Sequence, residues 1–179
     1  MAVVEAIATT YLEADATSIT FDLSSSPANT YEDLQLRGSV RTTRATALEP
    51  VAVQFNGDTG ANYQTHKMAG YGTSQVSGGE FNQVRTHVAS VMPTNTDKGG
   101  FYGYFVCDIS DYRNANKNTT LSYVSGENGS DQYVVFGSGM WDNQTAKPHS
   151  GVTSIKIYPN NGSDFTRGSE FTLYGLNSA

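Results

Sequence analysis

The stretch Phe55-Asn56-Gly57-Asp58-Thr59-Gly60-Ala61-Asn62-Tyr63 decides the fold, because a strong turn signal here follows an extended segment. Before the turn, Val51, Val53 and Phe55 alternate with Ala52 and Gln54, which is the period-two pattern of a half-buried strand. The turn itself contains residues that tolerate positive φ or close tight turns: Asn56, Gly57, Asp58, Gly60 and Asn62. The stretch therefore predicts a β-hairpin near the middle of an all-β sandwich.

The composition agrees with a single all-β domain. A chain of 179 residues fits one domain, and 37% apolar with only 16% charged residues suits short strands better than long helices. The spacing of strand and turn signals predicts about nine or ten antiparallel strands in a β-sandwich or jelly roll. We assign this domain to residues 17–179 and predict an N-terminal arm or edge strand over residues 1–16.

Individual segments show which side chains should face the core. In Ser18–Leu23 the inward row is Ile19, Phe21 and Leu23, and in Tyr31–Arg41 it is Leu34, Leu36, Gly38 and Val40. A glycine in an inward row suggests a bulge or a close approach of the two sheets. Residues 70–79 are rich in glycine and predict a surface loop, residues 80–92 a single weaker strand, and residues 132–141 a central strand that is apolar on both faces at its start.

Several classes of function are disfavoured by the residues present. A net charge of −6 without a Lys/Arg cluster argues against direct nucleic-acid binding, and no apolar run approaches the roughly 20 residues of a membrane helix. His66, His87 and His149 lie far apart and without metal-ligand spacing, so we interpret them as ordinary surface or loop residues. Cys107, the only cysteine, is predicted to be a buried thiol. We expect no cofactor, no metal and no enzymatic activity.

One pair of aromatic residues is a candidate ligand platform. Tyr133 and Trp141 share a face of the strand predicted at residues 132–141 and could stack on a sugar ring, as carbohydrate-binding sandwiches do. Packing in the core is the alternative, and it is favoured because eleven tyrosines in 179 residues pair by chance.

Four blocks of the chain resemble a family of tailed-bacteriophage virion proteins. They are Ser18-Ile19-Thr20-Phe21, then Tyr31 to Arg41, then Phe55 to Tyr63, and finally Phe171-Thr172-Leu173-Tyr174-Gly175-Leu176. Their order and spacing are similar from about Ser18 to Leu176, and the central block is the most specific. Gln54 departs from the pattern, because the family usually has arginine at this position. Residues 70–79 and 142–150 match nothing in the family.

The resemblance implies a β-sandwich or jelly roll without catalytic residues, either as a separate structural protein of the particle or at the tip of a fibre. Because the sandwich begins within about 16 residues of Met1, we expect a capsid decoration or cement protein of the virion, assembled in the host cytoplasm. Its expected partners are the major capsid protein and further copies of itself, as a dimer or trimer.

The expected contact is the segment Met1–Leu12, with Val3, Val4, Ile7 and Tyr11 as candidate residues, acting as an arm that adds a strand to a neighbouring sheet. Alternatively, this segment is simply the domain's own edge strand. The competing function is a receptor- or carbohydrate-binding module of the tail. That function requires Trp141 and nearby tyrosines to be exposed around a groove, whereas a cement protein should expose apolar surface at the arm and the strand edges.

Overall fold

A computed structural model describes residues 3–46, 48–92, 100–127, 132–146 and 150–177. The described residues form an all-β fold of two antiparallel sheets, with one helical turn, α1 (Asn143–Ala146). The strands are β1 (Val3–Tyr11), β2 (Ile19–Asp22), β3 (Asp33–Val40), β4 (Glu49–Phe55), β5 (Tyr63–Tyr71), β6 (Ser74–Gln83), β7 (Thr86–Met92), β8 (Gly103–Ser110), β9 (Thr119–Gly126), β10 (Tyr133–Trp141), β11 (Ser154–Pro159) and β12 (Glu170–Asn177).

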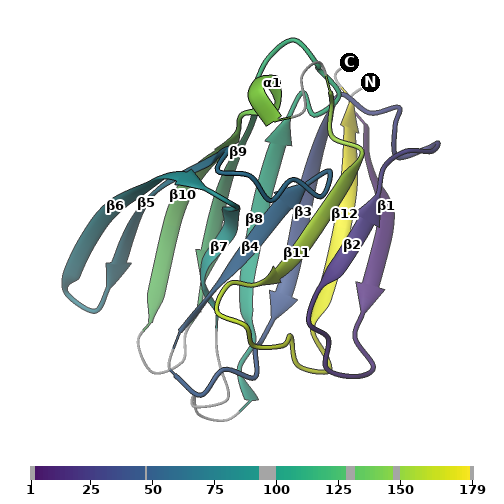
Figure 1. The fold of residues 1–179 in the computed structure, drawn as a ribbon. Coiled ribbons are helices and arrows are strands. Elements are labelled where there is room, and N and C mark those ends of the chain that lie inside the picture. Colours follow the sequence, from purple (N-terminus) through teal and green to yellow (C-terminus); the bar gives the residue numbers. More distant parts are fainter. Residues whose placement is uncertain (1–2, 47, 93–99, 128–131, 147–149, 178–179) are drawn as a thin grey trace.

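The two sheets are of unequal size. The larger has eight strands in the order β1-β12-β3-β8-β9-β10-β5-β6, and the smaller has four in the order β2-β11-β4-β7. In Figure 1 the smaller sheet lies in front of the larger one, with β6 and β1 at opposite ends of the larger sheet. This arrangement confirms the predicted all-β sandwich. The described residues contain twelve strands, more than the nine or ten expected from the sequence.

The core lies between the sheets and contains the predicted inward rows. Ile19, Phe21 and Leu23 of the first row are 8%, 5% and 2% exposed, and the apolar members of the second row are fully buried. Gly38 allows close packing, because a Cβ at this position would collide with the ring of Phe105 on the adjacent strand.

The prediction of a hairpin at residues 55–63 is wrong. The strand before the turn, β4, belongs to the smaller sheet, whereas β5 after the turn belongs to the larger sheet and pairs with β10 and β6. The chain does reverse at these residues, as the turn signal predicts, but the reversal carries it from one sheet to the other.

The prediction of a loop at residues 70–79 is also wrong. These residues form the end of β5, a tight turn at Gly72 with φ of 53°, and most of β6. Gly78 and Gly79 lie within β6, where glycine is tolerated because this strand is at the edge of the sheet. Residues 80–92, predicted as one strand, contain the end of β6 and the whole of β7, which lie in different sheets.

The N-terminal segment is an edge strand and not a separate arm. β1 pairs with β12 in antiparallel fashion from Val3↔Asn177 to Tyr11↔Glu170, with a register shift between Ala6 and Ala8. The boundary predicted at residue 16 therefore does not separate an arm from the sandwich, because β1 is part of the larger sheet.

The turn between the sheets is fixed by hydrogen bonds to a neighbouring segment. Asn56 and Gly57 adopt φ of 54° and 66°, which explains the Asn-Gly pair. The Asn56 amide donates to the carbonyl of Gly151 at 2.8 Å, and its oxygen accepts from the backbone N–H groups of Thr153 at 2.7 Å and Ser154 at 3.1 Å. These contacts attach the turn to the start of β11.

Asp58 is the centre of the same turn. Its side chain is 7% exposed and accepts hydrogen bonds from the indole Nε1–H of Trp141 at 2.7 Å and the backbone N–H of Gly60 at 2.8 Å. The amide of Asn62 donates to the same carboxylate at 3.1 Å. Because Trp141 ends β10 of the larger sheet, Asp58 ties the turn to that sheet.

We predict that Asp58→Ala lowers the free energy of unfolding by about 2 to 4 kcal/mol, because a buried indole N–H loses its acceptor. Urea unfolding measures the loss. The matched control is Thr59→Ala, an exposed position in the same turn, which should change stability by less than about 0.5 kcal/mol. Equal effects of the two substitutions would contradict the role assigned to the carboxylate.

Candidate binding surface

The outer face of the larger sheet carries exposed apolar side chains in its middle. Tyr104, Val124, Val134, Phe136 and Met68 are 51%, 45%, 49%, 53% and 59% exposed, respectively. Together with half-buried Val106 they form what we call the outer patch. The patch spans β8, β9, β10 and β5, which are neighbours in the sheet.

Strand register brings the patch together in two rows. In the first row, Val106 is opposite Val124, Val124 is opposite Phe136, and Phe136 is opposite Met68. Directly opposed residues of an antiparallel pair have side chains on the same face, so these four side chains are contiguous. The second row contains Tyr104 and Val134 on either side of Gly126.

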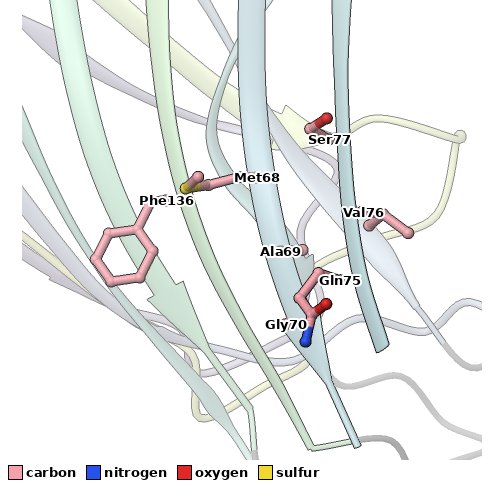
Figure 2. Close-up of a pocket in the computed structure, with 7 residues that line it drawn as sticks. All are labelled: Met68, Ala69, Gly70, Gln75, Val76, Ser77 and Phe136. Atoms are coloured by element: carbon pink, nitrogen blue, oxygen red, sulfur yellow. The ribbon is translucent and has the colours of Figure 1, made fainter. Parts of the chain in front are cut away.

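Glycines produce shallow hollows beside the apolar side chains. Gly126 leaves a hollow between Tyr104 and Val134. Gly70, opposite Val134, leaves another hollow between β5 and β6, and nothing lies within 4 Å of the place where its Cβ would be. Figure 2 shows this second hollow, with Phe136 and Met68 on one side and Gln75 and Val76 on the other.

The chemistry of the outer patch suits a partner with an apolar surface. None of its six side chains carries a charge. On the same face of each strand, the residue two positions beyond the first row is polar: Asp108, Ser122, Ser138 and His66. An apolar centre with a polar margin is the usual anatomy of a protein interface. Isolated apolar residues on a surface are ordinary, but a contiguous set on neighbouring strands marks an interaction site.

A more polar hollow lies on the same face toward β12. Its lining includes Arg37, Tyr104, Glu170 and Tyr174, and the guanidinium carbon of Arg37 is 4.8 Å from the centre of the Tyr174 ring. Aromatic rings beside charged hydrogen-bonding groups can bind a sugar.

The predicted ligand platform is wrong for Trp141. Its side chain is fully buried against Phe55 and Tyr63, with ring centres 5.6 and 6.4 Å away. Tyr133 is half-buried and stacks on Tyr71 at 4.7 Å between ring centres. The two residues share the inner face of β10, and the most exposed apolar residues of this strand are Val134 and Phe136 of the opposite face.

The candidate contact residues of the N-terminal segment lie on the edge strand. Val4 and Tyr11 are 59% and 53% exposed, whereas Ile7 is half-buried against the core. Val3 belongs to β1, but its side chain lies outside the described part of the structure. The expectation that exposed apolar surface lies at the edges is therefore incomplete, because the outer patch lies in the middle of the sheet.

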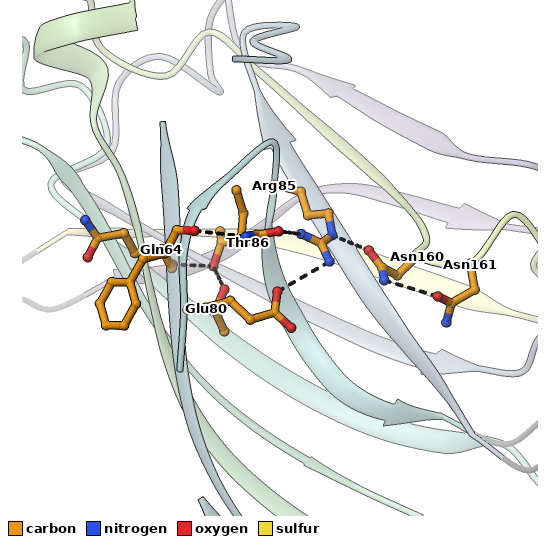
Figure 3. A network of polar contacts seen from close by, with 9 residues as sticks. Gln64, Glu80, Arg85, Thr86, Asn160 and Asn161 are labelled. Carbon is orange, nitrogen blue, oxygen red and sulfur yellow. Dashed lines mark hydrogen bonds and ion pairs between the residues drawn. The ribbon is translucent and has the colours of Figure 1, made fainter. Parts of the chain in front are cut away.

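A part-buried polar network connects the start of β7 to the end of β11. Arg85 is 16% exposed and contacts Glu80 at 3.3 Å, Gln83 at 2.9 Å and the side-chain oxygen of Asn160. Figure 3 shows Arg85 between Glu80 and Asn160. The network joins the end of β6 to the smaller sheet and so fixes the connection between the sheets.

His87 lies beside this network and is 2% exposed, so its interpretation as a surface or loop residue is wrong. Burial lowers its pKa from 6.5 to about 3, and the positive charges of Arg85 and Lys67 act in the same direction. Asn160 opposes the shift weakly, although neither ring nitrogen makes a hydrogen bond of good geometry. The ring is therefore neutral at physiological pH. His66 is exposed, and His149 lies outside the described residues.

We predict that His87 makes the fold sensitive to mild acid. The folded-state pKa lies below the value of 6.5, so the unfolded chain takes up the proton first as pH falls. The contribution of His87 to the free energy of unfolding is therefore fully present above pH 6.5 and is lost as the pH falls toward 3. The loss between pH 6.5 and pH 5 is about 2 kcal/mol. Urea unfolding at both pH values should show this decline in the native protein and in His66→Gln, but not in His87→Gln. The same decline in His87→Gln would contradict the assignment.

The described residues give no sign of a metal site or a membrane span. No three His, Cys, Asp or Glu side chains among them are grouped to hold a metal ion, and no helix in the described ranges is long and apolar enough to cross a membrane. Cys107 is fully buried, as predicted, and burial raises the pKa of its thiol.

Comparisons with known proteins add little to this description. No family model matches the sequence, and no curated protein matches it. A solved structure of the alginate lyase Aly36B aligns with a TM-score of 0.32 and 9% identity over 95% of this chain and 79% of that chain. A mutant of the same lyase in complex with an alginate tetrasaccharide aligns with a TM-score of 0.31 and 10% identity over 96% and 79% of the two chains. Similarity at this level carries no argument about function.

Proposed function

We propose that this chain is a non-enzymatic structural protein of a bacteriophage virion, a capsid decoration protein that binds the major capsid protein through the outer patch. The observation that carries the proposal is the contiguous, uncharged set of exposed side chains on β8, β9, β10 and β5. The resemblance of residues 18–176 to tailed-bacteriophage virion proteins supports the setting.

The geometry suits attachment to an assembled shell. The face of an eight-stranded sheet is broad, so it can cover adjacent capsid subunits, and a stable interface needs about 800 Å² on each partner. A protein that binds the assembled lattice but not the free subunits stabilises the shell by linkage. The side of the larger sheet that faces away from the smaller sheet is available for such a contact.

A tail-located receptor- or carbohydrate-binding module is the second candidate, and the hollow lined by Arg37, Tyr104, Glu170 and Tyr174 favours it. The two tyrosine rings of this hollow can stack on a sugar ring, and the Arg37 guanidinium and the Glu170 carboxylate can hydrogen-bond its hydroxyl groups. It shares Tyr104 with the outer patch, so Tyr104 cannot discriminate the two functions, whereas Tyr174 and Phe136 can.

The test measures binding of the purified protein to phage shells that lack it, to free capsid subunits and to host cells. Phe136→Ser removes the largest apolar side chain of the patch, and Gly70→Arg fills a hollow that has space for a side chain. Each should weaken binding to shells about tenfold or more. The control is Phe81→Ser, which removes a phenylalanine that is 64% exposed on β6, outside the patch.

Unchanged shell binding by both patch variants would contradict the proposal. Binding to cells that is lost in Tyr174→Ala and kept in Phe136→Ser would instead support the receptor-binding function. Because all substituted side chains are at least partly exposed, circular dichroism and melting temperature should confirm that every variant is folded.

A further inference from the structure

Among the described residues, β1 is paired on one side only, and the directions of the backbone groups at its other edge can be derived from its bonds to β12. The N–H of Leu12 donates to the carbonyl of Ser169 at 2.9 Å, so the backbone N–H and C=O groups of Leu12 are directed toward β12. Thr10, two residues earlier and opposite Phe171, points the same way. Thr9 and Tyr11 therefore direct their N–H and C=O groups away from the sheet.

In the first half of β1 the odd-numbered residues, and not the even-numbered ones, direct their backbone groups toward β12. The carbonyl of Leu176 accepts from the N–H of Glu32, on the side of β12 that faces β3, so Gly175 and Asn177 point toward β1. Their partners in the register are Glu5 and Val3, which leaves Val4 and Ala6 directed outward. The register shift between Ala6 and Ala8 accounts for the change of parity.

Two common protections of an exposed edge strand are absent from β1. Proteins protect such edges with lysine, proline, inward-pointing charges or bulges, and the sequence VVEAIATTY contains no Lys, Arg or Pro. Its one charged residue, Glu5, accepts a hydrogen bond from the hydroxyl of Tyr31 at 2.8 Å and is engaged within its own domain. The bulge at Ile7 is the one irregularity.

We propose that two copies of this chain pair through β1, antiparallel and related by a twofold axis between Ile7 and Ala8. In this register Val4 lies opposite Tyr11 of the second copy, and Ala6 lies opposite Thr9. These four residues are the ones with outward-directed backbone groups. In this register each of their N–H and C=O groups faces a backbone group of the second copy with which it can form a hydrogen bond. A strand paired with itself in this way forms a closed, isologous interface.

Side chains agree with the same register. Val4 and Tyr11 lie opposite Leu176 and Glu170 of β12, on the outer face, and they are the exposed large apolar residues among the β1 side chains that the structure describes. The twofold places them in contact, where they cover one another. Glu5 lies opposite Thr10 of the second copy, so no like charges are opposed, and the two bulges at Ile7 lie side by side at the axis.

The dimer would join two eight-stranded sheets into one continuous sheet. Because opposed side chains share a face, the axis is perpendicular to the sheet and the outer faces of both copies point the same way. If the proposed function holds, the dimer therefore presents two outer patches to one shell and gains avidity. The dimer itself does not depend on that function.

Sedimentation velocity over a range of protein concentrations tests the inference without shells or cells. The native chain should dimerise. Thr9→Pro removes an outward N–H and leaves the backbone bonds to β12 in place, at a position where an edge strand accepts proline. It also removes the 3.0 Å hydrogen bond between the Thr9 and Thr172 hydroxyl groups. Tyr11→Lys adds a charge at the contact. Both variants should be monomeric, whereas the control Phe81→Ser, at the opposite edge, should remain a dimer.

Cysteine cross-linking tests the register. Oxidation of the double variant Val4→Cys/Tyr11→Cys should give a covalent dimer, because opposed residues of an antiparallel pair lie within disulfide range. Neither single variant should cross-link, and buried Cys107 should not react. A native chain that is monomeric or trimeric, or a dimer unaffected by both Thr9→Pro and Tyr11→Lys in folded protein, would overturn the proposal.

Discussion

The hydrogen bond from the Trp141 indole to the buried Asp58 carboxylate holds the two sheets in their relation to each other. Asp58 lies in the turn that follows β4 of the smaller sheet, and Trp141 is the last residue of β10 in the larger sheet. Tyr63 adds a second connection, because its hydroxyl accepts from the backbone N–H of Phe55 at 3.0 Å while its ring stacks on Trp141. Burial raises the pKa of Tyr63, so the hydroxyl stays protonated and can also donate to the carbonyl of Asp58 at 3.1 Å. The donors that surround the Asp58 carboxylate offset the cost of burying it.

This arrangement decides which face of the larger sheet is left for binding. The aromatic residues of the connection occupy the inner face of β10 and β5, and the smaller sheet covers much of the remaining inner surface. Glycines permit the close packing, since a Cβ on Gly137 would collide with the ring of Tyr123 and one on Gly139 with Thr86. The outer face has no such cover among the described residues, so its apolar side chains remain in solvent. The outer patch is thus a consequence of the same strand alternation that fills the core.

Much of the fold could be predicted because period-two patterns identify strands and their inward faces. Ile19 and Leu36 lie in the core as expected, and residues 55–63 do reverse the chain. What the turn residues cannot specify is the partner of the following strand: β5 pairs with β10, some seventy residues away in the chain, through a register set by long-range contacts. Gly78 and Gly79 misled the prediction for β6, because glycine is a weak strand former in general but is tolerated at an edge.

The candidate site was harder to predict because an exposed apolar side chain and a buried one look alike in a sequence. Val134, Val135 and Phe136 follow one another, and the run signals that both faces of β10 are apolar without saying which face the second sheet covers. The buried bond of Trp141 to Asp58 resolves this, since it assigns the odd-numbered residues of β10 to the core and so places Val134 and Phe136 outside. An apolar run that is read as a doubly covered strand can therefore be a singly covered strand with a partner still to bind. In this chain the sequence of β10 contains the apolar residues of the outer patch, and the position of the second sheet determines that they are exposed.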